Sequence, residues 1–258
     1  MNATAAGVVL VGGRSSRMGT PKADLEWHGS TLLRRTTDVL ARSVSGPVVV
    51  VRAAGQPLPR LDHAVTVVDD PEPGRGPVLG LATGLTAASA AGATTAFVCA
   101  TDLPFLHPAY VRRLLGLLDD DHEVALPHLG GFPQPLAAAY RTSLAGVLTD
   151  MASAQQWRLR ALFDRCRVRE LDGAALLAGS DLAELDPGLD SVVNVNSPDD
   201  YRAARARPGP VVTVLHLGRA HRVEAATLAE AATAVGAPAP VPREGERPLV
   251  SGDRVELD

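Results

Sequence analysis

Residues 8–22 read VVLVGGRSSRMGTPK, a short apolar, β-branched run that breaks into two glycines. Such a run predicts a buried strand. Glycine has no Cβ, so it lets the backbone turn sharply and approach a ligand closely. Three cations, Arg14, Arg17 and Lys22, lie among small and hydroxylated residues in the nine positions after Gly13. A strand that ends in a cationic glycine loop predicts an anion site, most commonly one for a polyphosphate.

Lys22 is the only lysine among the 25 basic residues of the chain, and all the others are arginine. Lysine presents a compact point charge on a flexible stem, which suits a transferring phosphate. Arginine suits a fixed bidentate clamp. The alternative is that Lys22 is a chance survivor in an arginine-biased composition. Its cationic neighbours favour the functional interpretation.

Two other phosphate loops do not fit this stretch. A Walker A loop requires G-x4-G-K-[ST], whereas here five residues separate Gly13 from Gly19 and Thr-Pro-Lys follows. The dinucleotide fingerprint G-x-G-x-x-G is absent, and Pro21 delays any helix. Instead, the stretch resembles the L-x-G-G-x-S-x-R-M-G-x-x-K signature of the nucleotidyltransferases typified by molybdenum cofactor guanylyltransferase. The resemblance covers roughly residues 7–205 and implies that Leu10, Val11, Gly12, Gly13 and Lys22 bind the nucleotide.

Two carboxylates extend the resemblance. Asp102, in CATDLPFL, corresponds to the aspartate of the family's C-x-x-D-x-P motif, which holds magnesium. A hard oxygen ligand facing phosphates suits Mg²⁺; the alternative role is to cap the turn before Pro104. Asp70 matches the family's nucleotide-contacting aspartate, whereas Asp69 beside it is expected to be solvated. The resemblance therefore implies a Mg²⁺ site at Asp102 and a nucleotide contact at Asp70.

Asn194 and Asn196, in NVNSPDD, match the family's late N-x-N-[TS]-P motif near the second substrate. The same pattern can simply begin a helix, and we weigh the two interpretations equally. His107 and His128 are interpreted as structural. Three positions depart from the family pattern: Val11 replaces alanine, Pro21 replaces an acidic residue, and Arg52 replaces an asparagine near the nucleotide. The third departure bears on base recognition.

Composition narrows the class of protein. The 258 residues carry a formal net charge of −4, which gives no general attraction to nucleic acid or acidic membranes. No apolar run approaches the roughly 20 residues that span a bilayer, and no secretory signal is visible. Two cysteines, Cys99 and Cys166, are too few for a disulfide framework. We therefore expect a cytoplasmic protein without nucleic-acid or membrane partners.

Short apolar runs alternate with helical segments, which predicts a mainly parallel sheet covered on both faces. The fold class is therefore α/β, and the resemblance implies a Rossmann-like three-layer nucleotidyltransferase fold. Further strands are expected at 48–51, 65–68, 96–100, 124–126, 136–140 and 167–171, with a last extended piece at 192–195. Helices are expected over 31–44 with Ser30 as N-cap, from Pro77, and over 108–118. Ligands of such sheets bind beyond the carboxyl ends of the strands, where the glycine loop, Asp70 and Asp102 are expected.

Composition changes near residue 206, so we predict a nucleotidyltransferase domain over 1–205, a linker over 206–210 and a small α+β module over 211–258. Thr227 and Glu230 have the spacing of a capping box for a short helix that ends near Gly236. The predicted order of strand, strand, helix and strand resembles the β-grasp fold of ubiquitin-like sulfur carriers. Those carriers need a terminal Gly-Gly, whereas this sequence ends at Asp258. A packing or dimerisation role is the better interpretation, and a homo-oligomer is left open.

The chemistry follows from the absence of an obvious general base. A phosphate monoester is already ionised near pH 7, so nucleotidyl transfer needs charge neutralisation and alignment instead. Arg17, Lys22 and a magnesium on Asp102 would supply both. The resemblance implies transfer of GMP from GTP to the phosphate of molybdopterin with release of pyrophosphate. Gly13 favours guanine, because cytidylyl-transferring relatives commonly read Ala-Gly. Transfer of CMP, transfer to another phosphorylated small molecule, and non-catalytic nucleotide binding remain alternatives.

Overall fold

The structure of the chain is a computed structural model that describes residues 4–11, 21–61 and 64–257. Gly12, Gly13 and Arg17 of the glycine loop lie outside the described residues. The strands are β1 (Ala5–Leu10), β2 (Glu26–Trp27), β3 (Ser30–Thr31), β4 (Val48–Ala53), β5 (Val65–Asp70), β6 (Thr95–Ala100), β7 (Val124–Leu129), β8 (Phe132–Pro133), β9 (Ala137–Arg141), β10 (Val168–Leu171), β11 (Val211–His216), β12 (Arg219–Glu224) and β13 (Arg254–Leu257). The α-helices are α1 (Leu32–Ala41), α2 (Pro77–Ala90), α3 (Pro108–Leu117), α4 (Ala145–Ser153), α5 (Arg160–Phe163), α6 (Gly173–Leu177), α7 (Leu182–Leu185), α8 (Pro198–Arg205), α9 (Leu228–Val235) and α10 (Pro242–Gly245), with 3-10 turns η1 (Lys22–Asp24), η2 (Thr142–Leu144) and η3 (Asp190–Val192).

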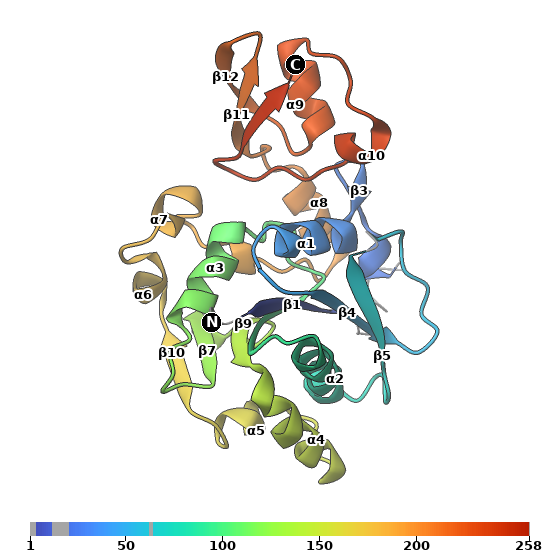
Figure 1. Cartoon of the computed structure of the whole chain (residues 1–258), viewed down its shortest axis with the longest axis vertical. Coiled ribbons are helices and arrows are strands. Elements are labelled where there is room, and N and C mark those ends of the chain that lie inside the picture. Colours follow the sequence, from blue (N-terminus) through green and yellow to red (C-terminus); the bar gives the residue numbers. More distant parts are fainter. Residues whose placement is uncertain (1–3, 12–20, 62–63, 258) are drawn as a thin grey trace.

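An eight-stranded sheet forms the centre of the molecule (Figure 1). Its order is β10-β7-β9-β6-β1-β4-β5, and β8 pairs with β7. Strands β6, β1, β4 and β5 run parallel to one another, whereas β9 is antiparallel to both β6 and β7. The predicted α/β class with a mainly parallel sheet is confirmed. Because these four parallel strands are adjacent, their carboxyl ends lie along one edge of the sheet.

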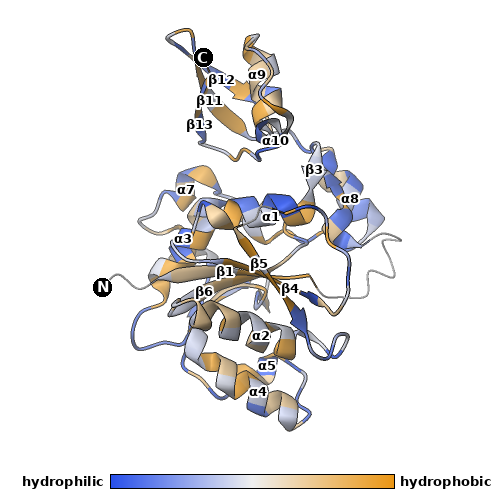
Figure 2. Ribbon diagram, turned by 45° about the vertical axis from the view of Figure 1, so that its right-hand side comes forward, coloured by the Kyte–Doolittle hydropathy of each residue, from blue (hydrophilic) through white to orange (hydrophobic). Residues whose placement is uncertain are grey.

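Helices cover both faces of this sheet, so the molecule has the predicted three layers (Figure 2). Successive strand residues point to opposite faces. Val9 and Phe97 pack with residues of α1 and α3, whereas Val8 and Val98 pack with residues of α2 and α4. Burial on both sides explains why the strand sequences read as continuous apolar runs.

The start of α1 differs from the prediction by one residue. Ser30 belongs to β3, and Thr31 is the N-cap, whose side chain accepts a hydrogen bond from the Arg34 N–H at 3.3 Å. His28 and Gly29 have positive φ angles of 48° and 79° and join β2 to β3. The prediction of Ser30 as N-cap is therefore wrong, because this hairpin turn draws Ser30 into strand pairing.

The extended piece expected at 192–195 is also wrong in part. Val192 ends the 3-10 turn η3, and the segment joins no sheet. Val195 instead donates its N–H to the Asp102 carbonyl at 3.0 Å. This contact ties the late segment to the loop after β6, which is the loop that carries Asp102.

The C-terminal segment forms a second, three-stranded sheet of order β12-β11-β13. Strand β11 is antiparallel to β12 and parallel to β13, and the intervening helix α9 ends at Gly236 in a left-handed conformation. Thr227 caps α9 as expected, but the Glu230 carboxylate accepts from the Ala226 N–H rather than from the cap residue. The sheet has a small apolar cluster of its own, made of Val212, Val214, Ala225, Ala231, Leu249 and Val255.

Residues before β13 return to the larger unit. Val250 is buried in the apolar cluster that includes side chains of α1 and α3. His107 contacts the Ser251 carbonyl at 3.0 Å, and Arg42 pairs with Asp253 at 2.9 Å. The second sheet is thus attached to the α1 side of the molecule (Figure 1). Within the described ranges, the helices lack the length and apolar character that crossing a membrane would require.

Candidate active site

The candidate site begins where β1 and β6 end side by side. These strands pair in parallel up to Leu10 and Ala100. Asp102 follows two residues after the end of β6, and Lys22 opens the 3-10 turn η1 after the glycine loop. The sequence therefore positions both residues at the carboxyl edge of the sheet, where ligands of such sheets bind.

Lys22 joins three segments that are distant in the sequence. Its Nζ donates to Asp102 Oδ2 at 2.8 Å and to Asn196 Oδ1 at 2.8 Å. These partners lie 80 and 174 residues away along the chain. The Lys22 and Asp102 side chains are 23% and 14% exposed, so the ion pair is reachable from solvent without being fully hydrated. Three residues predicted from separate motifs therefore form one polar cluster.

Asn196 lies at a helix start, which confirms one interpretation of its motif; its role toward the acceptor stays a prediction. Ser197 caps α8 and forms a capping box with Asp200, so the motif does begin a helix. Asp200 Oδ2 also accepts the Asn196 N–H at 3.1 Å. Hydrogen bonds from Ser197 and Asn196, with the Lys22 charge nearby, lower the pKa of Asp200. The helix start thus holds Asn196 in place while its side chain contacts Lys22.

Asn194 does not join this cluster. Its side chain is exposed and donates to the Val192 carbonyl at 3.1 Å. Asp200, by contrast, supports the site without having been singled out as a site residue. The S-x-x-D spacing of Ser197 and Asp200 is a capping-box pattern and could have indicated that role.

Asp102 uses only one of its carboxylate oxygens on the described residues. Oδ2 accepts from Lys22, whereas Oδ1 is buried and has no hydrogen-bond partner there. A capping role for the side chain before Pro104 is therefore not seen within the described ranges. A buried carboxylate oxygen without a partner is costly unless a ligand binds it. Among those same residues no group of three or more histidine, cysteine or acidic side chains forms a metal cage.

Asp70 lies farther along the same edge, at the end of β5. Its Oδ1 accepts the Glu72 N–H at 3.0 Å. Gly80 of α2 passes close to Oδ2, since a Cβ at position 80 would lie 3.4 Å from that oxygen. Strand β4 lies between β5 and β1 in the sheet order. Asp70 is thus at the predicted edge but outside the Lys22 cluster.

Asp69 departs from the expectation that it is merely solvated. Its Oδ1 accepts from Arg52 Nε at 2.8 Å, and Arg52 Nη1 donates to the Gln56 carbonyl at 2.9 Å. Residues 52 and 69 are register partners in the β4–β5 pair, which brings the two charges together. Arg52, the residue that departs from the family pattern, is therefore held by hydrogen bonds at the edge of the sheet.

Leu10 and Val11 are both 6% exposed and belong to the apolar clusters on opposite faces of the sheet. Their side chains are core residues, so any contact with a nucleotide would come from the backbone. Cys99 of β6, three residues before Asp102, is fully buried, and burial raises the pKa of its thiol far above the ordinary value. A thiolate nucleophile at Cys99 is therefore disfavoured.

Comparison with known proteins shows the family of the chain. Residues 7–171 match the family described as MobA-like NTP transferase domain. A protein of Mycobacterium tuberculosis named "Probable molybdenum cofactor guanylyltransferase" is 42% identical over 162 residues, which cover 62% of this chain and 79% of that protein. A protein of the same name from Mycobacterium avium is 36% identical over 206 residues, covering 78% and 96%.

Solved structures share the fold. Molybdopterin-guanine dinucleotide biosynthesis protein A from Archaeoglobus fulgidus superimposes with a TM-score of 0.61 at 22% identity, covering 78% of this chain and 96% of that one. The 2-C-methyl-D-erythritol 4-phosphate cytidylyltransferase from Thermus thermophilus superimposes with a TM-score of 0.54 at 18% identity, covering 79% and 98%. The fold is thus one that the chain shares with a nucleotidyltransferase, the cytidylyltransferase. Among the nucleotidyltransferases, the chain belongs to the family of MobA-like NTP transferase domains.

Proposed function

We propose that this chain transfers GMP from GTP to the phosphate of molybdopterin and releases pyrophosphate. The observation that carries the proposal is the cluster in which Lys22 bridges Asp102 and Asn196. The names of the mycobacterial relatives support the choice of donor and acceptor. In this proposal Lys22 and Asp102 face the donor nucleotide, and Asn196 faces the acceptor.

The residues act by positioning and charge neutralisation. Donor and acceptor are both anions, so they repel each other until cations lie between them. Lys22 offers three donors on a flexible stem, of which two are used by Asp102 and Asn196. The third donor has no partner among the described residues, so it can contact a phosphate oxygen, and the two bonds can be exchanged as phosphates enter. No general base is required, because the attacking phosphate oxygen is already ionised near pH 7.

Asp102 is the residue that we assign to Mg²⁺. The buried and unpartnered Oδ1 is a hard oxygen donor of the type that Mg²⁺ prefers, and one carboxylate suffices when phosphate oxygens complete the coordination. When bound, the ion would neutralise phosphate charge and stabilise the charge that develops on transfer. Lys22 holds the other oxygen and so fixes the direction of Oδ1. Arg17, a further predicted cation, lies outside the described residues.

Guanine is proposed as the base on the strength of Gly13 and of the relatives' names. The fold alone does not distinguish the bases, since the Thermus thermophilus cytidylyltransferase shares it. Arg52 would oppose guanine only if its guanidinium reached into the nucleotide pocket. Its bonds to Asp69 and Gln56 hold it at the sheet edge, which favours retaining the guanine assignment.

The test is pyrophosphate release by the purified chain with Mg²⁺, GTP or CTP, and molybdopterin with or without bound molybdate. We expect release with GTP that depends on molybdopterin, and CTP should turn over far more slowly, because unpaired polar groups in a guanine site disfavour cytosine. Equal turnover of CTP would overturn the guanine assignment. Pyrophosphate release without molybdopterin, but with another phosphorylated acceptor, would overturn the assignment of molybdopterin as the acceptor. Nucleotide binding without release under any condition would establish the non-catalytic alternative.

A further inference from the structure

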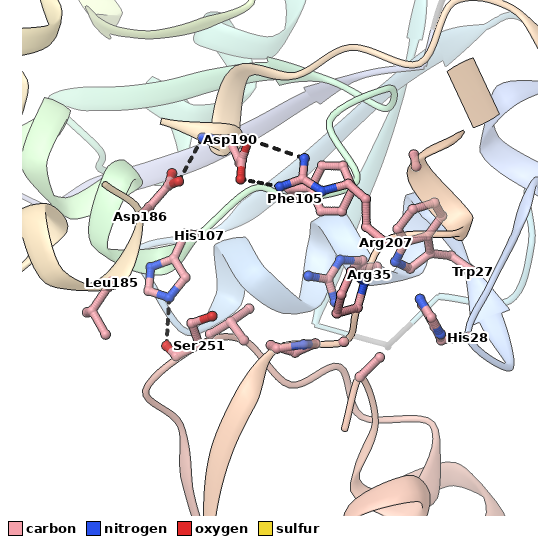
Figure 3. Close-up of a pocket in the computed structure, with 16 residues that line it drawn as sticks. Trp27, His28, Arg35, Phe105, His107, Leu185, Asp186, Asp190, Arg207 and Ser251 are labelled. Carbon is pink, nitrogen blue, oxygen red and sulfur yellow. Dashed lines mark hydrogen bonds and ion pairs between the residues drawn. The ribbon is translucent and has the colours of Figure 1, made fainter. Parts of the chain in front are cut away.

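A cavity of about 160 Å³ lies at the junction between α1, the end of α8 and the C-terminal segment (Figure 3). It is lined by side chains from both units, among them Trp27, Arg35, Phe105, Asp190, Arg207 and Ser251. Engineered protein cavities of about 150 Å³ hold a benzene molecule, so this one has room for a small ion. It is separate from the Lys22 cluster, none of whose three residues lines it.

Arg35 is the unusual member of the lining. It is only 8% exposed, and its guanidinium contacts backbone carbonyls: Nε donates to Pro104 O at 2.7 Å and Nη1 to Leu249 O at 3.4 Å. No carboxylate of the described residues forms an ion pair with it, and Nη2 donates to none of those residues. Burial and the charge of Arg42 lower its pKa to about 10, although Asp253 and Asp38 act in the opposite direction. The charge of this buried guanidinium is therefore incompletely compensated.

The acidic residues of the cavity are already engaged elsewhere. Both oxygens of Asp190 pair with Arg207, one of them at 3.2 Å. The two oxygens of Asp186 accept the N–H groups of Asp190 and Ser191 at 2.7 and 3.0 Å. These carboxylates already have partners (Figure 3). The N–H groups of Arg35 Nη2 therefore remain as hydrogen-bond donors without a partner among the described residues.

Two histidines complete the polar lining. His107 uses both ring nitrogens, one with the Ala109 N–H and one with the Ser251 carbonyl. His28 Nδ1 lies 3.7 Å from Glu230 Oε1, and burial lowers the pKa of His28. A histidine side chain is neutral or positively charged, so neither histidine compensates the charge of Arg35.

We propose that this cavity binds a small tetrahedral oxyanion of the phosphate class through the Nη2 end of Arg35. Nη2 carries two N–H groups, and each can donate a charge-assisted hydrogen bond to an oxygen of such an ion. The ion would compensate a buried charge and stabilise the junction, because Arg35 contacts both the loop after Asp102 and the C-terminal segment. The proposal does not depend on the transfer reaction.

The test is calorimetric titration of the full-length chain with inorganic phosphate or pyrophosphate, at an ionic strength held constant with chloride. In Lys22→Ala, which lacks the charge that we assign to the other site, we expect one saturable site per chain. Arg35→Gln should weaken binding by about tenfold or more, since charge-assisted hydrogen bonds are the strong ones. The matched control is Arg113→Gln. Arg113 also donates to backbone carbonyls, those of Ala175, Leu176 and Ala178, but it does not line the cavity.

Two further variants keep the result decisive. Ala226→Met fills the cavity while leaving Arg35 in place, so it should remove binding even if Arg35→Gln does not fold. Lys22→Ala should retain this binding, because Lys22 belongs to the other site. Saturable binding of phosphate or pyrophosphate that both Arg35→Gln and Ala226→Met weaken supports the proposal. Absence of saturable binding, loss of binding in Lys22→Ala, or unchanged binding in Ala226→Met overturns it without affecting the proposed transfer.

Discussion

The two sheets of this chain are covered in different ways. The eight-stranded sheet packs helices against both faces, and each face has its own apolar cluster. The three-stranded sheet packs mainly against α9, so that Val212 and Val214 of β11 are buried, while Val211, which points to the opposite face, is 39% exposed. Burial on both faces leaves the strand ends as the accessible part of the larger sheet.

This difference explains where chemistry can occur. In the larger sheet, the parallel strands β1 and β6 end at one edge, and Asp102, Lys22 and Asn196 meet there. The smaller sheet contributes through residues 249–253, whose contacts reach α1 and α3. We therefore expect mutations at the edge of the larger sheet to change turnover, and changes in the smaller unit to affect stability.

The largest effect is expected for Asp102→Asn. The substitution keeps the size of the side chain but removes the charge that we assign to Mg²⁺, so turnover should fall by about a thousandfold or more. Steady-state pyrophosphate release over a Mg²⁺ titration measures this. Asp69→Asn is the matched control, because Asp69 lies at the same edge but pairs with Arg52. Unchanged Mg²⁺ dependence in Asp102→Asn would show that Asp102 is a structural residue.

Lys22→Ala should reduce turnover by about a hundredfold, on the order of 3 kcal/mol, because it removes a charge that we assign to the transferring phosphate. Lys22→Arg should restore turnover only in part, since the guanidinium fork is larger and differently directed. Single-turnover kinetics at saturating GTP would separate loss of chemistry from loss of binding. Rates near that of the unmodified chain in Lys22→Ala would contradict the assignment of the cluster.

Gly84→Ala tests how closely the larger sheet packs against α2. A Cβ at this position would lie 2.5 Å from Val8 Cγ1, so the substitution should cost about 1–3 kcal/mol in unfolding free energy. Gly116→Ala in α3 is the control, because no atom lies within 4 Å of its Cβ position. There we expect no loss, or a gain of up to about 1 kcal/mol from helix propensity. Equal denaturation midpoints for the two variants would disagree with the packing described.

The smallest effect on nucleotide binding is expected from ending the chain after Pro208. We propose that residues 1–205 form the nucleotidyltransferase domain and 211–258 a separate module joined by 206–210. The shortened chain should bind GTP within about twofold, although removing the buried Val250 should cost about 2 kcal/mol of stability. Calorimetric GTP titration and thermal unfolding measure the two effects. Loss of GTP binding would show that the module supports the site.

Much of the fold could be predicted because its signals are local. Apolar β-branched runs marked β1, β4 and β6, and Pro77 marked the start of α2. The Thr227 cap and Gly236 bounded α9 in the same way. The helices α4 to α7 and the antiparallel direction of β9 were not predicted. Helix α4 has no side-chain cap, and α5 to α7 span only four or five residues, too few to show a helical period even though Asp172 caps α6. Strand direction depends on pairing with β6 and β7, which lie elsewhere in the chain.

The sequence by itself determined the fold class, the family resemblance, and the identity of the residues at the sheet edge. Strand periodicity and glycine positions depend on backbone sterics, which act over a few residues. Only the tertiary structure decided that Asn196 rather than Asn194 meets Lys22, that Asp69 is paired with Arg52, and that Arg35 is buried beside a cavity. Such contacts join segments up to 174 residues apart, so they depend on how strands and helices pack rather than on any local pattern.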